Sequence, residues 1–225
     1  MRIAPAAVIF DLGGVVFDSP IAGLRRLEQT LGMPRSLLNR HIAQSEAWSK
    51  MERGLISVAE FAASYDAELA APTCDPMLRS VSGETVISTI LSATSVPRPS
   101  YVEAIRSLRV KGVKTAALTN NFQPPAGQKE ASIVDTMFDV VVESSVVGLR
   151  KPDPRIYLLA CDKLGVRPDE CVFLDDIGVN LKSAQQVGMA TIRVPLEDVG
   201  GLQALRELEA VVAKGPLFTT GKASL

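Results

Sequence analysis

Polar side chains follow four separate apolar runs of this 225-residue sequence, at the points where buried strands are expected to end. They are Asp11, Thr119 with Asn120, Lys151, and the pair Asp175 and Asp176. A single such group would carry little weight, because turns favour Asp and Asn in any protein. Four groups at corresponding places predict one converging site that combines carboxylates, a hydroxyl, an amide and an ammonium.

Such a set suits a reaction on a charged substrate. A carboxylate at Asp11 can attack phosphorus and form a covalent aspartyl-phosphate. Mg²⁺ takes hard oxygen ligands, and Asp11, Asp176 and the backbone carbonyl of Gly13 can supply them. The cation also allows an anionic nucleophile to approach an anionic phosphate.

The remaining groups of the predicted site fit the phosphoryl group itself. Thr119 and Asn120 can donate hydrogen bonds to its oxygens, and Lys151 offers a positive charge to the group being transferred. The sequence therefore predicts a small-molecule phosphate substrate.

The runs that precede these polar groups predict a parallel sheet. Each is short and apolar without clean alternation, which is typical of strands covered on both faces. They span residues 6–10, 114–118, 138–143, 171–174 and 190–194. Helical patterns at 100–111, 154–164 and 179–187 separate the later runs. This alternation predicts a Rossmann-like, doubly wound α/β core, in which ligands bind beyond the carboxyl ends of the strands.

Residues 19–95 break the alternation and read as helices alone. We predict helices over 21–31, 35–54 and 57–69, with Ser57 and Glu60 forming a capping box for the third. The expected arrangement is a core from residues 1–18 and 96–225 with a helical cap domain from 19 to 95. The segment 214–225 lacks periodicity and is expected to fray.

Four motifs in order carry a resemblance to a known family. DLGGV (11–15), LTN (118–120), RKPDPRIY (150–157) and FLDDIGVN (173–180) resemble the motifs of the haloacid dehalogenase-like hydrolases, and the stretches around the last two are most similar to the N-terminal phosphatase domain of soluble epoxide hydrolases. The resemblance implies that Asp11 is the nucleophile and that Asp176 binds Mg²⁺. It gives Asp175 a place in the first or second shell of the metal, and it implies an inserted cap of the C1 type.

One position departs from that family. Its phosphatases usually carry a second Asp two residues after the nucleophile, which protonates the leaving alcohol, whereas this chain has Gly13. Loss of a general acid typically costs about 10²–10⁴ in rate. Asp18 could replace it, although a solvated hinge residue is the plainer interpretation. Gly13 and Gly14 are interpreted as loop glycines that permit close approach to a ligand.

Two further functions remain open at this stage. A haloacid dehalogenase uses an aspartate without a metal and does not need the second Asp, but only Arg40 stands near the place expected for a halide-binding arginine. A catalytically weak module that binds a phosphate or a partner is the other alternative. His41 is the single histidine and is expected to pack or to be solvated, which disfavours a histidine-based triad.

Composition excludes several other classes. The formal net charge is −1 and no long basic run occurs, so a nucleic-acid partner is not expected. No uninterrupted apolar stretch approaches the ~20 residues of a membrane span. The three cysteines have wide spacings without a CxxC, which disfavours a disulfide framework or a zinc site and predicts a cytoplasmic protein. Cys171 begins an apolar run and is expected to be a core thiol. The oligomeric state stays open.

Overall fold

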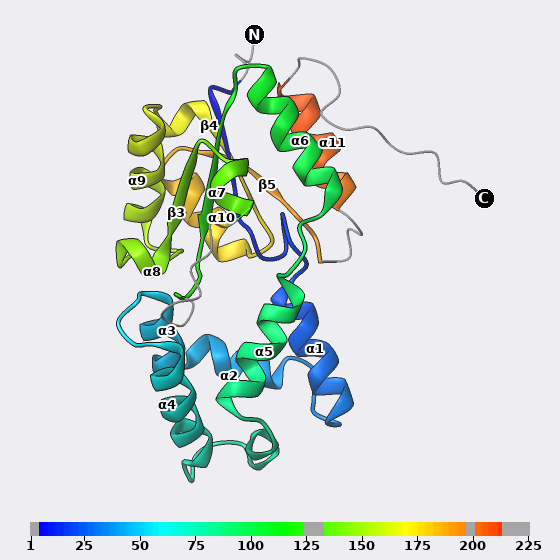
Figure 1. Ribbon diagram of the computed structural model, residues 1–225, viewed down its shortest axis with the longest axis vertical. Coiled ribbons are helices and arrows are strands. Elements are labelled where there is room, and N and C mark those ends of the chain that lie inside the picture. Colours follow the sequence, from blue (N-terminus) through cyan, green and yellow to red (C-terminus); the bar gives the residue numbers. More distant parts are fainter. Residues whose placement is uncertain (1–4, 124–132, 197–200, 213–225) are drawn as a thin grey trace, which may run out of the picture.

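The computed structural model describes residues 5–123, 133–196 and 201–212. Within these residues a five-stranded parallel sheet has the order β3-β2-β1-β4-β5 (Figure 1). Its strands are β1 (Ala7–Phe10), β2 (Lys114–Thr119), β3 (Val140–Glu143), β4 (Cys171–Asp175) and β5 (Ala190–Arg193). The predicted Rossmann-like α/β class is confirmed, and each predicted strand is present within two residues.

Both faces of the sheet are covered by helices, as the unbroken apolar strands require. In β1, Val8 and Phe10 belong to a core shared with α6 (Pro99–Val110), α7 (Ile133–Met137) and α11 (Leu202–Val212). Ala7 and Ile9 belong to the opposite core, shared with α9 (Pro154–Leu164) and α10 (Gly178–Gln186). Successive side chains of a strand point to opposite faces, so β1 is the central strand of both cores.

A group of helices lies beyond the carboxyl ends of the strands (Figure 1). These are α1 (Pro20–Thr30), α2 (Leu37–Gln44), α3 (Glu46–Glu52), α4 (Val58–Ala70), η1 (Pro76–Ser80) and α5 (Gly83–Ala93). They enclose a third hydrophobic cluster, which includes Leu38, Met51, Phe61 and Tyr65. None of the described helices is long and apolar enough to cross a membrane.

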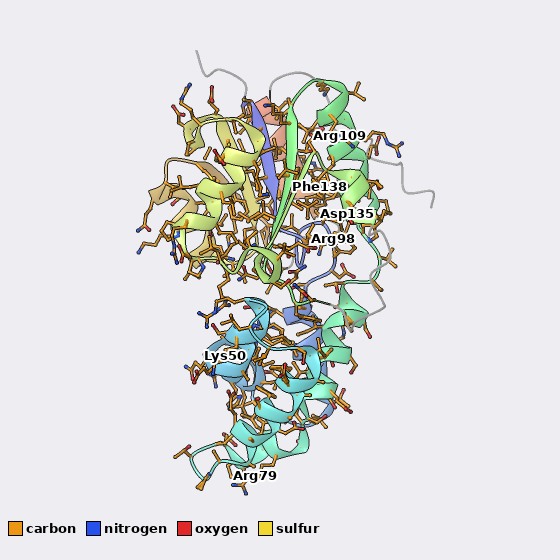
Figure 2. The ribbon with its side chains drawn as sticks, turned by 60° about the vertical axis from the view of Figure 1, so that its left-hand side comes forward. Lys50, Arg79, Arg98, Arg109, Asp135 and Phe138 are labelled. Carbon is orange, nitrogen blue, oxygen red and sulfur yellow. The ribbon has the colours of Figure 1, made fainter. Side chains whose placement is uncertain are left out.

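The chain leaves and re-enters the core at one place. Phe17 forms an isolated antiparallel bridge with Pro97, and the Arg98 amide donates to the Val16 carbonyl at 2.7 Å. The Arg98 guanidinium also donates to the Val15 carbonyl at 3.2 Å and lies between core and helical region (Figure 2). These contacts hold the two crossing segments side by side.

The prediction of one helix over 35–54 was wrong. The chain breaks at Ser45, whose backbone is extended at φ −65° and ψ 127°, and whose hydroxyl accepts from the Trp48 amide to cap α3. The capping box of Ser57 and Glu60 is confirmed at the start of α4. The sequence patterns did not single out α5, α7, α8 (Ser144–Val147) or α11. The tail predicted to fray, 214–225, lies outside the described residues.

Candidate active site

The carboxyl ends of β1 and β4 bring three carboxylates together. Asp11 follows β1, and its amide donates to the Leu174 carbonyl of the neighbouring strand at 2.9 Å. Asp11, Asp175 and Asp176 each offer a carboxylate oxygen, and these oxygens lie within 4.8 Å of one another. Like charges this close repel strongly unless a cation stands among them. The predicted convergence of these three residues is therefore present.

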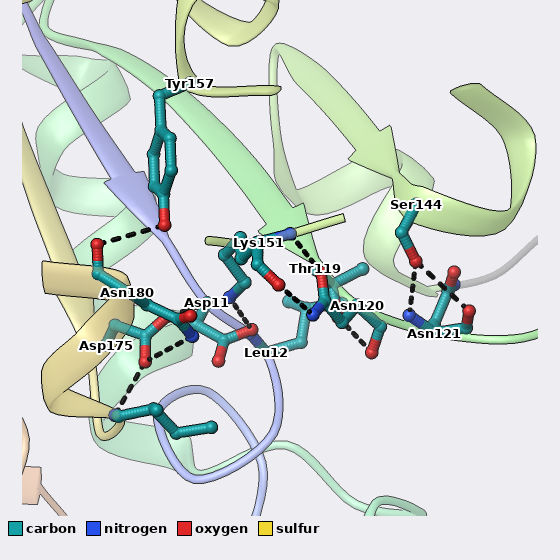
Figure 3. Close-up of polar contacts among 11 residues, drawn as sticks. Asp11, Leu12, Thr119, Asn120, Asn121, Ser144, Lys151, Tyr157, Asp175 and Asn180 are labelled. Carbon is teal, nitrogen blue, oxygen red and sulfur yellow. Dashed lines mark hydrogen bonds and ion pairs between the residues drawn. The ribbon is translucent and has the colours of Figure 1, made fainter. Parts of the chain in front are cut away.

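Lys151 supplies one cation to this cluster. Its Nζ lies 2.8 Å from Asp11 Oδ1 and 2.8 Å from Asp175 Oδ2, and the side chain is 1% exposed (Figure 3). The Leu12 amide donates to the same Asp11 oxygen at 2.7 Å. Both contacts therefore hold the Asp11 carboxylate through Oδ1.

Asp175 is fully buried, and both of its carboxylate oxygens accept hydrogen bonds. Its Oδ1 accepts from the Ile177 amide at 2.7 Å, and Asn180 Nδ2 lies 3.0 Å from its Oδ2, which also accepts from Lys151. The Tyr157 hydroxyl in turn donates to the Asn180 carbonyl at 3.0 Å (Figure 3). Asp175 thus fixes Lys151 and the start of α10 at once.

Asp176 has one carboxylate oxygen that is available to a ligand. Its Oδ2 accepts a 3.4 Å hydrogen bond from Ser19, whereas its buried Oδ1 has no hydrogen-bond partner among the described residues. A buried carboxylate oxygen without a partner is costly, so the geometry fits a bound cation. The carboxylate oxygens of Asp11 and Asp176 are hard donors, which suits Mg²⁺.

Gly14 lets the loop approach this carboxylate. Its φ is +84°, in the left-handed region, and a Cβ there would lie 2.6 Å from Asp176 Cγ. Gly13 has no positive φ, and a Cβ would lie 3.1 Å from Pro20 Cδ. Gly14 therefore permits close approach of the loop to the Asp176 carboxylate, whereas close approach of either glycine to a ligand stays a prediction.

The residues after β2 support Lys151. Asn120 Oδ1 accepts from the Lys151 amide at 2.8 Å, and Asn120 Nδ2 donates to the Lys151 carbonyl at 3.0 Å. Thr119 ends β2 beside them and is 4% exposed. Asn121 follows and is tied to α8, since its amide donates to Ser144 Oγ at 3.0 Å (Figure 3).

The electrostatics of the site follow from burial. Burial, followed by the charge of Asp175, raises the pKa of Asp176 from 3.8 to about 7. Burial also raises the pKa of Asp11 well above its ordinary value, against the influence of Lys151. For Lys151 burial acts to lower the pKa, but Asp11 and Asp175 outweigh it and the pKa is raised. The ammonium is therefore firmly protonated, and three carboxylates share one positive charge.

The side chains of several residues considered in the sequence do not belong to this cluster. Asp18 has a 75% exposed side chain that pairs with Arg98 at 3.3 Å, and Arg40 is exposed on α2. His41 Nδ1 lies 3.0 Å from the Tyr65 hydroxyl within the helical region, which agrees with a packing role.

Sequence reasoning missed other residues around the site. Ser19 carried no signal that could have identified it as a partner of Asp176. Tyr157 carried one, because it ends the motif RKPDPRIY, but its contact with Asn180 could not be read from spacing.

Comparison with known proteins agrees with this fold. A family profile described as haloacid dehalogenase-like hydrolase matches residues 5–188. The chain is 36% identical over 216 residues to mouse bifunctional epoxide hydrolase 2, covering 90% of this chain and 38% of that protein. It is 28% identical to sesquiterpene phosphatase astK of Aspergillus oryzae, covering 90% and 95%.

Solved structures show the same fold. A haloacid dehalogenase-like family enzyme of Bacteroides thetaiotaomicron, crystallised with magnesium and inorganic phosphate, superposes with a TM-score of 0.59 at 20% identity, covering 85% of this chain and 95% of that one. The chain spans less than two fifths of the length of the first curated relatives that it matches. It belongs to the haloacid dehalogenase-like hydrolase family, as its motifs predicted.

Proposed function

We propose that the protein is a Mg²⁺-dependent phosphomonoesterase that works through an aspartyl-phosphate on Asp11. The observation that carries this proposal is the buried cluster of Asp11, Lys151, Asp175 and Asp176, in which one oxygen of Asp176 lacks a partner. Asp11, Asp176 and the Gly13 carbonyl would hold the metal. When bound, Mg²⁺ would offset the negative charge of the substrate and of the carboxylates around it.

The chain's own residues carry the chemical steps. Asp11 Oδ1 is held by Lys151 and Leu12, so we assign the attack on phosphorus to Oδ2. An oxygen–phosphorus bond forms as the bond to the leaving group breaks, and the leaving oxygen takes a proton from solvent water, since position 13 carries no acid. Water then hydrolyses the aspartyl-phosphate and regenerates Asp11. Lys151 stabilises the phosphoryl charge throughout, and Thr119 donates to a phosphoryl oxygen.

We propose a role for Asn120 other than the phosphate contact that its place in the sequence predicted. Both polar atoms of its side chain contact the Lys151 backbone, so we propose that Asn120 chiefly positions Lys151. Asp175 likewise acts by fixing Lys151 rather than by touching the substrate.

We further propose that residues 19–95 form a cap that selects the substrate, above a core made of 1–18 and 96–225. An apolar or lipid phosphate is the favoured substrate class, with sugar phosphates as the alternative. Support comes from the similarity to an epoxide hydrolase and to a sesquiterpene phosphatase. A phosphate-release screen over lipid, sugar and nucleotide monoesters tests this, and preference for nucleotides would contradict it.

The decisive experiment compares the wild type with Asp11→Asn, with and without a chelator. Phosphate release that depends on added Mg²⁺ and on Asp11 is the expected result. Halide release from a 2-haloacid that resists the chelator would instead establish a dehalogenase. Binding of phosphate without turnover of any monoester would establish a binding module.

A further inference from the structure

Helix α3 meets the core through a charged contact. Glu52, at its last position, places Oε2 2.5 Å from an Nη of Arg150, in the loop before α9. The Glu52 side chain is 7% exposed and the Arg150 side chain 30%. Ion pairs in water contribute little, but breaking a buried pair leaves a charge without compensation. Because the Glu52 carboxylate is buried, loss of its contact with Arg150 should be costly.

Apolar and backbone contacts surround this pair. The Trp48 ring, one turn earlier on α3, packs edge-on against Phe122 with ring centroids 6.2 Å apart. Just beyond α3, the Gly54 backbone at φ +70° lies so close to the Ser145 carbonyl that a Cβ would collide with it. Helix α3 thus contacts both segments that follow β2 and β3.

Burial raises the pKa of Glu52, with Arg150, Trp48 and Lys151 opposing it. The charges of Arg150 and Lys151 therefore both reach this carboxylate from the core. Among the described residues, the other buried glutamate is Glu28, and backbone amides satisfy it inside the helical region.

Arg150 and Lys151 are adjacent in the chain, and their side chains contact different carboxylates. Arg150 reaches to Glu52, whereas Lys151 reaches to Asp11 at 2.8 Å. Asn120 holds the Lys151 backbone at both its amide and its carbonyl. A displacement of Arg150 would act on the peptide bond that it shares with Lys151, whose ammonium lies between two carboxylates.

We propose that Glu52 is a positioning residue: its ion pair with Arg150 holds α3 on the core and keeps Lys151 in register with Asp11. The effect on turnover rests on the proposed function, whereas the attachment of α3 does not. A residue of the helical region thereby takes part in the electrostatics of the reaction centre.

Trp48 provides the test, since it is the only tryptophan of the chain and lies at this contact. The Glu52→Gln variant removes the charge and keeps the shape. Its Trp48 fluorescence should be quenched more efficiently by acrylamide than that of the wild type. Its kcat/KM for an aryl phosphate should fall about tenfold, which corresponds to about 1.4 kcal/mol, with the larger part of the loss in kcat.

Glu46→Gln is the matched control, because Glu46 lies on the same helix, is 76% exposed and pairs with Lys50 at 2.8 Å. It should leave both readouts unchanged. Arg150→Gln should resemble Glu52→Gln, and the double variant should be no worse than either single one, as for two residues that act as one pair. Thermal melts identify any variant that fails to fold.

Equal quenching in Glu52→Gln and Glu46→Gln would overturn the attachment of α3. Raised quenching with unchanged kcat/KM would overturn the link to Lys151. If the wild type released no phosphate from any ester, the proposed function would fail, yet the quenching comparison would still decide whether Glu52 holds α3.

Discussion

The Asn120 side chain forms hydrogen bonds with both backbone groups of Lys151, accepting from its amide at 2.8 Å and donating to its carbonyl at 3.0 Å. One amide side chain thereby fixes the residue whose ammonium separates Asp11 from Asp175. Only a group with a donor and an acceptor side by side can make both contacts.

The first prediction follows from these two hydrogen bonds. Asn120→Asp keeps the acceptor but turns the donor into a second acceptor that faces the Lys151 carbonyl. We expect kcat/KM to fall by about 10–100-fold, in line with ~1–3 kcal/mol for a buried unsatisfied group. Asn121→Asp is the control in steady-state assays, since Asn121 Oδ1 only accepts, from Ser145 Oγ at 2.9 Å. Equal losses in the two variants would contradict the assigned role.

A second prediction concerns the loop glycine beside Asp176. Gly14→Ala introduces strain at φ +84° and a Cβ that collides with the carboxylate. Gly112→Ala introduces comparable strain at φ +75° with nothing within 4 Å of the Cβ. Both should lose about 1–2 kcal/mol of stability from the left-handed backbone, but only Gly14→Ala should weaken Mg²⁺ binding in calorimetric titrations. Identical Mg²⁺ affinities would show that Asp176 does not need this close approach.

Gly13 yields a third prediction. Without an acid at this position, wild-type turnover should favour aryl phosphates, which leave as stable phenolates, over alkyl phosphates. Gly13→Asp should accelerate alkyl phosphates more than aryl ones, by up to about 10²-fold, the lower range for a general acid. The backbone there has no positive φ, so the substitution needs only a small shift of Pro20. A leaving-group series measures this, and a flat series for the wild type would mean that another residue supplies the proton.

The fourth prediction links pH, metal and stability through Asp176. Its pKa of about 7 in the folded protein lies above the ordinary 3.8. The folded state therefore binds the proton more tightly, and the stability this contributes is lost as pH rises from about 4 through 7. In EDTA the Tm should fall over this range, and the increase in Tm on adding Mg²⁺ should grow with pH. Asp176→Asn should weaken both trends without abolishing them, because burial also raises the pKa of Asp11. A pH-independent effect of Mg²⁺ on the wild type would contradict the assignment.

The fifth prediction tests a structural carboxylate. Glu28 is 1% exposed and accepts from the amides of Ser36 at 2.7 Å and Leu38 at 2.8 Å. Glu28→Gln replaces one acceptor by a donor that faces these amides, which should lower the free energy of unfolding by about 1–3 kcal/mol. Urea denaturation measures the change. Glu207→Gln, at an exposed position of α11, should stay within about 0.5 kcal/mol of the wild type.

Much of the core could be predicted because its signals are local. The runs that became β1 to β5 are apolar throughout, and each polar group of the predicted site follows such a run at the carboxyl end of a parallel sheet. The geometry of Asp11, Lys151 and Asp175 follows from that topology. This geometry does not depend on the helical region.

The remainder depends on contacts between distant segments. The break at Ser45 could not be predicted, because helical periodicity continues on both sides of it. The pairing of Glu52 with Arg150 joins residues almost 100 positions apart. Arg150 begins the motif RKPDPRIY, but nothing in the sequence around either residue indicates this partner. Pairings of this kind are decided by tertiary packing rather than by local preference.

The central place of β1 in the sheet has a consequence for motion. Its amides and carbonyls are hydrogen-bonded to β2 on one side and β4 on the other, and all four of its residues are fully buried. Amide protons in such a strand exchange with solvent only when the whole domain opens, so β1 should be among the slowest-exchanging segments of the chain. Asp11 is therefore anchored to one of the parts of the protein that fluctuate least, and any movement needed to admit a substrate must come from the elements around it.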